Sequence, residues 1–363
     1  MSLPPLPLID GKLFIDNSGF MEGCSSCYRY LQYKCLNLRI PSAEKPALNF
    51  GSAMHLAEEL RYVLYGTGPV DQQYWELLTP ILTDFFEKHK PASDDWRTLN
   101  WCMEMMKKYM ERYPMEEFQL LRYKKSVPCP ACEGRGCKQE SQEEATWGID
   151  KCVWCKGTGK REMMVECTFT LPLYTHIEPG NTIPVIYSGR IDLPLSLNSD
   201  IWIMDNKHVG MLGQTFWDEQ RMAAQYRGYV WAFEQLTGTR PKGYMVNAVR
   251  TKEPPLYITG TGRRGSQSPG QWWQDSMQRE RFLCEPWKIE EWKNNTIDLV
   301  EEFMWHYGRG YMPQKTKWCS QYGRCPYYDI CTITPQDRGV LLQSGQFMDN
   351  VWSPLKQPTQ SKQ

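Results

Sequence analysis

Two features are missing from this sequence of 363 residues, a long apolar run and an excess of charge of one sign. No apolar stretch approaches the roughly 20 residues that a membrane-spanning helix needs, which argues against a membrane protein. The N-terminus lacks the basic and then apolar pattern of a secretory signal, so we expect a soluble, cytoplasmic protein. The 42 basic residues balance the 42 acidic ones, so net charge neither indicates nor excludes a nucleic-acid partner.

The order of patterns along the chain predicts an α/β protein with a helical N-terminal third. We expect helices at 49–65, 72–88, 95–113, 215–236 and 285–307, and strands at 12–15, 163–172, 184–195, 201–206 and 243–250. Ser18 is the predicted N-cap of an earlier helix that carries Cys24 and Cys27. Residues 259–270 are typical of a mobile loop and residues 354–363 of a disordered tail.

The same patterns divide the chain into four parts. These are an N-terminal helical part (1–127), a cysteine-rich insert (128–162), a core that carries the strands and the last cysteine cluster (163–335), and a C-terminal tail (336–363).

Fourteen cysteines in a chain without a secretory signal indicate metal ligands or free thiols rather than disulfides. Two Cys-x-x-Cys pairs, Cys129 with Cys132 and Cys152 with Cys155, supply the four thiolates of a closed tetrahedral zinc site. Glycines follow each pair and permit the tight turn that brings backbone amides to the sulfurs. Each half resembles the repeat of the DnaJ-type zinc domain. A redox pair or unligated thiols is the alternative.

A second cysteine cluster lies near the C-terminus, where five residues separate Cys319 from Cys325 and five separate Cys325 from Cys331. Three thiolates leave a four-thiolate site one ligand short. A distant cysteine can complete it, and the candidates are Cys24, Cys27 and Cys35. An iron–sulfur cluster and a zinc ion fit such a set equally well, and the absence of any metal is the third possibility.

A predicted hairpin carries the acidic residues of greatest interest. If the turn at 196–200 is centred between Asn198 and Ser199, Asp192 and Asp205 lie directly opposite each other. Opposed residues have Cβ atoms about 5 Å apart, so both carboxylates can bind one cation. Lys207 returns to the same face by side-chain alternation. The opposite face is apolar and is expected to be buried; it comprises Ile191, Leu193, Leu195, Trp202 and Met204.

Two carboxylates and a lysine on one sheet face suit metal-dependent phosphodiester hydrolysis, in which the metal activates water and the lysine orients it. The alternative for the hairpin alone is an ordinary solvated face of charged residues. Glu166 lies on a predicted strand that enters this region; we expect it to be solvated, and contact with the metal or its water is the alternative. The helical tryptophans are expected in the core rather than stacked on bases; they are Trp217, Trp231, Trp272, Trp273 and Trp305.

Together, these motifs resemble the PD-(D/E)XK nuclease superfamily, and within it the RecB-like exonucleases that carry an iron–sulfur cluster. That group includes AddB-type recombination nucleases, small CRISPR-adaptation exonucleases and phage proteins. Five motifs resemble the group in order: Cys24 with Tyr28-Arg29-Tyr30, Gly51 to His55, Gly189 to Asp192 with Asp205 to Lys207, Gln225 to Tyr229, and Cys319, Cys325 and Cys331. The resemblance implies a restriction-endonuclease-like α/β core, a mixed sheet flanked by helices, here with a helical N-terminal region and an inserted zinc module.

The resemblance also implies roles for single residues. Asp192 and Asp205 would bind Mg²⁺ or Mn²⁺, with His55 and the Asn206 carbonyl as further ligands. Lys207 would position the attacking water or help to deprotonate it.

Two further roles follow from the same family. Gln225 and Tyr229, one helical turn apart, would point at the DNA backbone or at the lysine. Cys24 would join the C-terminal cysteine cluster around a 4Fe–4S cluster, although Cys27 lies three residues away and competes for that position.

The expected function is hydrolysis of DNA phosphodiester bonds, exonucleolytic on single strands or duplex ends, in replication, recombination or repair. A helicase or recombination protein is the expected partner, and the host cytoplasm is the expected location if a phage encodes the chain. The first alternative is a non-catalytic protein that uses its zinc and iron–sulfur modules to bind nucleic acid or a partner. The second is a chaperone-like or redox protein built on the Cys-x-x-Cys pairs.

Overall fold

The computed structural model of the 363-residue chain describes residues 3–349 apart from 44, 130–131, 133, 136–151, 253–268 and 322. Most of the predicted loop at 259–270 and all of the predicted tail at 354–363 lie outside the described residues. In the described part of the chain, no helix combines the length and the apolar character needed to cross a membrane.

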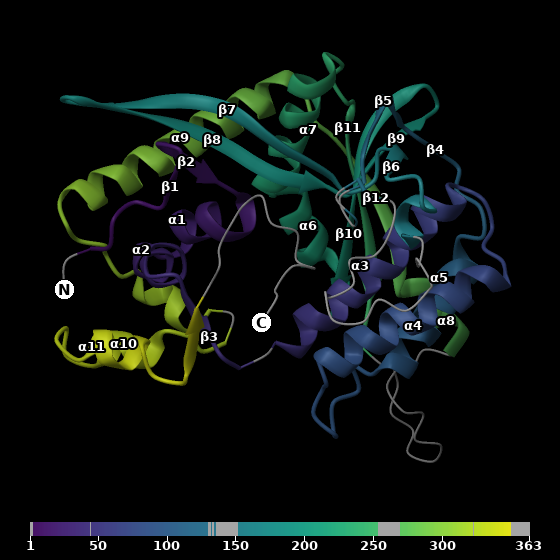
Figure 1. The fold of residues 1–363 in the computed structure, drawn as a ribbon, viewed down its shortest axis with the longest axis horizontal. Helices are drawn as coiled ribbons and strands as arrows, with labels where there is room; N and C mark the ends of the chain where they lie inside the picture. Colours follow the sequence, from purple (N-terminus) through teal and green to yellow (C-terminus); the bar gives the residue numbers. More distant parts are fainter. Residues whose placement is uncertain are drawn as a thin grey trace.

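A five-stranded mixed sheet forms the centre of the molecule (Figure 1). Its strand order is β12-β11-β10-β9-β4, and only the pair β10 and β11 is parallel. The strands are β4 (Gln119–Leu120), β9 (Leu193–Leu197), β10 (Asp200–Val209), β11 (Gly243–Arg250) and β12 (Met277–Leu283). All residues of β11 except Arg250 are buried, as expected for a strand covered on both faces.

A second sheet has the order β1-β2-β8-β7 and is built on a long antiparallel hairpin. Its strands are β1 (Leu8–Ile9), β2 (Lys12–Ile15), β7 (Cys167–Glu178) and β8 (Asn181–Ile191). The chain passes from β8 of this sheet to β9 of the central sheet through Asp192 alone. This residue therefore lies where the two sheets separate.

Helices cover both faces of the central sheet. On one face lie α3 (Pro46–Tyr65), α4 (Gln72–Lys88) and α5 (Leu99–Arg112), and on the other lie α6 (Gln214–Met222) and α7 (Ala224–Thr237). Helix α9 (Pro286–Gly308) packs on α7 and α1. Alternate residues of β11 show the two faces. Val246 and Ala248 pack in the cluster that includes α7, whereas Val249 packs in the cluster of α3 to α5. The predicted α/β fold with a mixed sheet between helices is confirmed.

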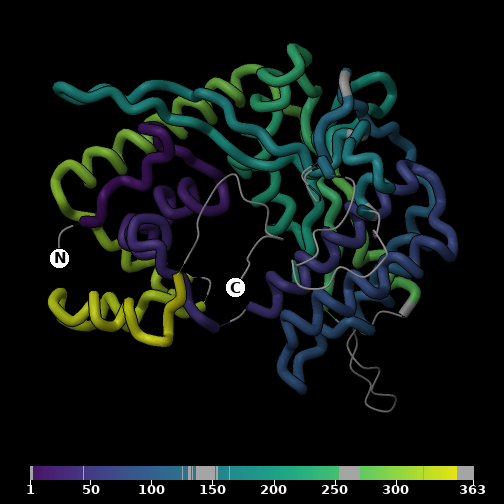
Figure 2. Tube along the Cα trace, viewed as in Figure 1, coloured from purple at the N-terminus to yellow at the C-terminus, as the bar shows by residue number. Residues whose placement is uncertain are grey.

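The two ends of the described chain lie side by side (Figure 2). The N-terminal segment contains two π-helical segments (Asn17–Met21 and Gln32–Leu36), α1 (Glu22–Ser26), α2 (Tyr28–Leu31) and β3 (Arg39–Pro41). The C-terminal segment contains a 3₁₀ turn (Thr316–Cys319), α10 (Tyr328–Thr332), α11 (Arg338–Leu342) and β13 (Phe347–Asp349). Strands β3 and β13 pair antiparallel, which joins the two segments. Strands β5 (Arg122–Pro128) and β6 (Lys160–Met163) pair at the two ends of the cysteine-rich insert. The other elements are a 3₁₀ turn (Val153–Cys155) and α8 (Pro269–Asp275).

Several local predictions need correction. Ser18 is not the N-cap of the first helical segment, because the Asp16 side chain accepts the hydrogen bond from the Phe20 N–H at 2.8 Å. The helix predicted at 215–236 is two helices, since the Tyr244 hydroxyl donates to the last carbonyls of α6 and ends it before α7 begins. The strand predicted at 184–195 is divided at Asp192 between two sheets. The strand predicted at 163–172 begins only at Cys167, and the helix predicted to carry Cys24 and Cys27 is interrupted at Cys27. The helix 72–88 and the strands 12–15 and 243–250 match to the residue.

Candidate active site and cysteine clusters

The hairpin between β9 and β10 has the predicted register. Leu197 pairs with Asp200 and Leu193 with Met204, so the turn is centred between Asn198 and Ser199. Both turn residues have positive φ, 52° and 67°, as a two-residue hairpin turn of the I′ class requires. One step beyond the Leu193–Met204 pair, Asp192 comes opposite Asp205. All five residues predicted on the apolar face of this hairpin are buried.

Asp192, Asp205 and Lys207 lie together and largely away from solvent. Asp205 is 2% exposed and Asp192 is 8% exposed, which excludes the alternative of a solvated charged face. The Lys207 Nζ lies 2.7 Å from the Asp205 Oδ2. The Asn206 backbone N–H donates to the Asp192 Oδ2 at 3.0 Å, which fixes this carboxylate beside β10. A buried charge needs such partners, because an unpaired one costs several kcal/mol.

Helix α7 supplies two more of the predicted residues. The Gln225 side-chain amide donates to the Asp205 Oδ1 at 3.2 Å and to the Tyr229 hydroxyl at 2.9 Å. Its carbonyl oxygen accepts from the Lys207 Nζ at 3.5 Å. Gln225 therefore holds both members of the Asp205–Lys207 pair. The predicted orientation of the glutamine toward the lysine has this geometric basis.

Helix α3 brings His55 to the other side of Asp192. The His55 Nδ1 lies 3.8 Å from the Asp192 Oδ2, and ligand atoms of His55, Asp192 and Glu166 lie within 4.8 Å of one another. Among the described residues, nothing hydrogen-bonds to the buried His55 Nδ1. One imidazole and two carboxylates with an unpaired nitrogen between them fit a divalent cation.

Glu166 was expected to be solvated, and this expectation is wrong. The residue is 7% exposed, and its carboxylate forms an ion pair with the Arg190 Nε at 2.5 Å. Its backbone N–H donates to the Asp192 carbonyl at 2.8 Å, which places it beside Asp192 in the candidate site. The chain turns here with a positive φ of 54° at Glu166, between β6 and β7. Neither glycine nor asparagine marks this turn, so the local sequence does not predict a positive φ at Glu166.

The electrostatics of the site favour a charged lysine and a neutral histidine. Burial opposes charge on Lys207, but Asp205 and Asp192 hold its pKa above the ordinary value, so the amine is a cation at neutral pH. Burial raises the pKa of Asp205 to about 6, against the effect of Lys207. Burial and the neighbouring His208 lower the pKa of His55, so its ring keeps a lone pair for a metal. A charged Lys207 can position the attacking water but cannot accept a proton from it, so the first of its two expected roles is favoured.

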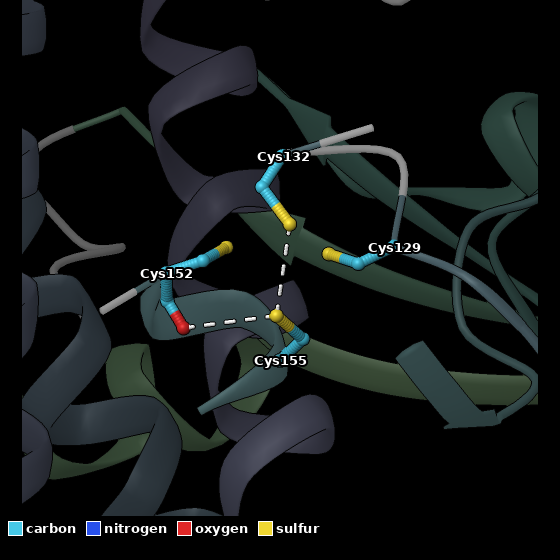
Figure 3. A group of neighbouring side chains, drawn as sticks. All are labelled: Cys129, Cys132, Cys152 and Cys155. Atoms are coloured by element: carbon cyan, nitrogen blue, oxygen red, sulfur yellow. Dashed lines mark hydrogen bonds between the residues drawn. The ribbon is translucent and has the colours of Figure 1, made fainter. Parts of the chain in front are cut away.

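The four cysteines of the insert converge on one point. Figure 3 shows the side chains of Cys129, Cys132, Cys152 and Cys155 turned toward one another. Their sulfurs lie within 4.8 Å, and the Cys132 and Cys155 sulfurs are 3.7 Å apart. The Gly159 N–H donates to the Cys155 Sγ at 3.2 Å, as the glycines after each pair led us to expect. A buried four-cysteine group of this kind can bind a metal ion.

This cysteine group is joined to the helix that carries His55. The Arg161 guanidinium, on β6, lies 2.9 Å from the Glu59 carboxylate on α3. The Arg161 side chain is 5% exposed, and burial opposes its charge, but Glu59 and Cys129 together raise the pKa of this guanidinium. The four-cysteine group and the candidate active site therefore both contact α3.

Two of the C-terminal cysteines, Cys325 and Cys331, lie close enough to Cys27 for its charge to affect their pKa values. Burial raises the pKa of Cys331, and Cys27 and Cys325 raise it further, whereas Arg29 lowers it. Cys319 and Cys27 likewise contribute to the raised pKa of Cys325. The Lys315 backbone N–H points at the Cys27 Sγ, at 3.5 Å.

Cys24 has other neighbours. It is fully buried in the main core, where Cys35, Lys315 and Glu302 surround it. The expectation that Cys24 joins the C-terminal cysteines is therefore not supported by its position. Between α1 and α2 the backbone of Cys27 is extended, and its sulfur accepts from the Lys315 N–H of the C-terminal segment.

Three of the five helical tryptophans, Trp217, Trp231 and Trp272, are buried as expected, and Trp273 packs at the edge of the α3–α5 cluster. Trp305 is an exception, with 57% of its surface exposed on α9.

The family model described as the PD-(D/E)XK nuclease superfamily matches residues 21–332, which contain every residue of the candidate active site. No curated protein matches the chain.

Proposed function

The chain belongs to the PD-(D/E)XK nuclease superfamily, whose members are metal-dependent phosphodiesterase nucleases, and from this premise we propose that it hydrolyses DNA. The observation that supports catalysis most directly is the buried contact of 2.7 Å between Lys207 and Asp205, beside Asp192. Holding two carboxylates and an ammonium in a buried site costs stability. A protein that only binds nucleic acid gains nothing from that cost.

The residues present fit a divalent cation, Mg²⁺ or Mn²⁺. His55, Asp192 and Glu166 would hold it, with Asp205 and the Asn206 carbonyl completing the set. When bound, the cation supplies Lewis-acid polarisation of the phosphate and a water of lowered pKa.

Three side chains would attract the phosphate and orient the water: Lys207, Gln225 and Tyr229. Lys207, as a cation, attracts the negatively charged phosphate and orients the attacking water by hydrogen bonding. Gln225 keeps the ammonium in place, since its carbonyl oxygen accepts from the Lys207 Nζ and its amide donates to Asp205. Tyr229 in turn accepts from the Gln225 amide and fixes its orientation.

Incubation of the purified chain with end-labelled DNA and Mg²⁺ or Mn²⁺ tests the function. We expect degradation by the wild-type chain and loss of at least 100-fold in rate for Asp205→Asn, an order of magnitude typical for removal of one electrostatic group. Linear and circular substrates, labelled at either end, separate exonuclease from endonuclease action. Equal degradation by the wild type and Asp205→Asn would refute the proposed site.

We further propose that the chain is an exonuclease of the RecB-like branch, acting on single strands or duplex ends in replication, recombination or repair. A helicase or recombination protein would be its partner. The support is the order of the five motifs in the sequence together with the pairing of the N-terminal and C-terminal segments through β3 and β13 (Figure 2).

A 4Fe–4S cluster is the proposed occupant of the C-terminal cysteines, with Cys27 as the fourth ligand beside Cys319, Cys325 and Cys331. Four thiolates in one place are the usual ligand set of such a cluster. It would tie the segment between α1 and α2 to the C-terminal segment.

Substitution of single cysteines distinguishes the two candidates for the fourth ligand. We expect Cys27→Ala to lose the iron and the broad visible absorption of the anaerobically purified protein, because one thiolate of four is removed. Cys24→Ala is expected to keep both. Iron analysis and absorption spectra of the two variants measure this, and the reverse pattern would return Cys24 to the cluster.

A structural Zn²⁺ is the proposed occupant of Cys129, Cys132, Cys152 and Cys155, because a closed set of four thiolates is typical of structural zinc. The ion would fix the β5–β6 ribbon and, through Arg161 and Glu59, its position on α3.

Loss of one ligand is expected to release this zinc. Cys152→Ser should reduce the zinc content by about one ion per chain and lower the thermal midpoint, since binding energy of the metal is folding energy. Cys167→Ser is the matched control, because Cys167 is also buried but lies outside the four-cysteine group. Its sulfur accepts a hydrogen bond from the Tyr123 hydroxyl at 3.2 Å. Unchanged zinc content in Cys152→Ser would contradict the assignment.

A further inference from the structure

A second group of metal-ligand side chains lies next to the candidate active site. Glu58 is on α3, one turn after His55, and His208 is on β10, directly after Lys207. Because side chains alternate along a strand, His208 points to the α3 face of the sheet while Lys207 points to the α7 face. Ligand atoms of His55, Glu58 and His208 lie within 4.8 Å of one another.

Two of the three side chains are almost fully buried, whereas 32% of the His55 side chain is exposed. Glu58 is 0% exposed, and the His208 side chain is 1% exposed. Glu58 and His208 are joined in the described structure by a hydrogen-bond contact between the His208 Nε2 and the Glu58 Oε1, at 3.3 Å. The His55 and His208 rings meet edge to face, with centroids 4.8 Å apart and without a hydrogen bond between them in the described structure.

Each of the three side chains has a buried polar atom without a partner. Within the described residues, no hydrogen bond reaches the Glu58 Oε2, the His208 Nδ1 or the His55 Nδ1. If the His208 Nε2 donates to Glu58, its Nδ1 carries a lone pair, so both the imidazole and the carboxylate present electron pairs and no proton. Leaving such groups unsatisfied costs about 1–3 kcal/mol each. A cation satisfies all of them at once.

We propose that His55, Glu58 and His208 form a second cation site, which takes a transition metal such as Mn²⁺ or Zn²⁺ in preference to Mg²⁺. The ligand set decides the preference. Two imidazoles and one carboxylate are a frequent set for zinc, and imidazole nitrogen favours transition metals, whereas Mg²⁺ prefers oxygen ligands and keeps several waters.

The second site shares His55 with the proposed catalytic site. A neutral imidazole offers one lone pair, so it can serve only one cation at a time. A transition metal held by Glu58 and His208 therefore draws His55 away from Asp192 and Glu166. The two sites compete, and Zn²⁺ is an inhibitor of the Mg²⁺-dependent reaction. This last consequence rests on the proposed nuclease function, whereas the metal site itself does not.

Binding of Mn²⁺ to the full-length protein tests the site without any activity measurement. Mn²⁺ is a suitable probe because thiolates bind it poorly, so the cysteine clusters contribute little. In Asp192→Asn, which disables the proposed catalytic site, we expect Mn²⁺ still to bind, with ¹⁴N couplings of two imidazoles in its pulsed EPR spectrum. A variant Asp192→Asn that binds no Mn²⁺, or binds it without imidazole nitrogen, would overturn the proposal.

Removal of the second site in the same background completes the test. Asp192→Asn/His208→Asn and Asp192→Asn/Glu58→Gln are each expected to bind Mn²⁺ at least tenfold more weakly than Asp192→Asn. Two doubles are used because either substitution alone can affect folding, and the EPR spectrum of Asp192→Asn decides the matter if neither folds. Unchanged Mn²⁺ affinity in a folded double variant would overturn the site.

Zinc inhibition tests the competition separately. The Zn²⁺ concentration that halves DNA hydrolysis in Mg²⁺ is expected to rise at least tenfold in His208→Asn, with each protein compared with its own rate in Mg²⁺ alone. An unchanged concentration would overturn the competition. Mn²⁺ binding in Asp192→Asn without any DNA hydrolysis by the wild type would support the metal site and count against the nuclease function only.

Discussion

Replacement of Lys207 by methionine is expected to lower kcat for DNA hydrolysis by about 10²–10³-fold, the range found when one preorganised electrostatic group is removed from an active site. Methionine is unbranched and of similar length, so it keeps the volume and removes the charge. The neighbouring Asp205, with its pKa already raised to about 6 by burial, then loses the cation that lies 2.7 Å from it. The carboxylate becomes harder to keep ionised, which weakens the site a second time.

The expected effect is on kcat more than on KM. Lys207 acts where negative charge develops on the phosphate, and an interaction that is stronger in the transition state than in the ground state appears in kcat. Initial rates over a range of DNA concentrations, with Mg²⁺ at saturation, separate the two constants. An increase in KM alone would mean that Lys207 only binds the DNA backbone.

The chain offers a matched control on the same sheet. Lys242 and Asp200 form an ion pair at 2.5 Å, with 49% and 41% of their side chains exposed. Lys242→Met therefore removes the same chemical group from a carboxylate in solvent, and we expect its rate to stay close to that of the wild type. Surface pairs contribute little, about 0–1 kcal/mol. A similar loss in both variants would show that DNA degradation depends on general positive charge rather than on the site.

The part of the site that could be predicted from the sequence is the part set by local periodicity. Asp192, Asp205 and Lys207 lie within 16 residues, and a two-residue turn fixes their register. Because a strand has a period of 2, one correct turn position placed all three side chains and the buried face behind them.

Residues that reach the site through tertiary packing gave no such signal. Glu166 enters at a turn with positive φ, and Glu58 and His208 meet only because α3 packs on β10. Cys24 and Cys27 are only three residues apart, so the sequence offers both as the fourth ligand. The structure separates them, because Cys24 lies in the main core and the Cys27 sulfur contacts Lys315 of the C-terminal segment. The Arg161–Glu59 ion pair spans 102 residues and follows from no local pattern.

Replacement of Glu116 by glutamine is expected to lower the free energy of unfolding by about 3–5 kcal/mol, the cost of removing one partner from a buried ion pair. The Glu116 side chain is 1% exposed and lies between two arginines, Arg61 at 2.9 Å and Arg279 at 2.5 Å. Glutamine keeps the shape but cannot neutralise either guanidinium. Burial of Arg61, 1% exposed, and Arg279, 16% exposed, then leaves positive charge without a counterion.

This loss is also expected to reach the active site, because the same network ends on β10. The Arg279 Nε donates to the Asn247 side-chain oxygen at 2.9 Å, and the Asn247 amide donates to the Asn206 Oδ1 at 2.7 Å. Asn206 lies between Asp205 and Lys207, and its N–H holds Asp192. Chemical denaturation of Glu116→Gln measures the stability, and the Mg²⁺ concentration needed for half-maximal hydrolysis, which we expect to rise, measures the effect on the site.

Glu111→Gln is the matched control, since Glu111 pairs with Lys108 at 2.9 Å but 65% of its side chain is exposed. We expect its unfolding free energy to change by less than about 0.5 kcal/mol, because solvent screens the exposed pair. If Glu116→Gln were as mild as Glu111→Gln, solvent would have to reach the two arginines. A Glu116→Gln variant that is destabilised but keeps the wild-type Mg²⁺ requirement below its melting temperature would show that the network supports the fold without positioning β10. Strand pairing with Asn247 would then be enough to hold Asn206.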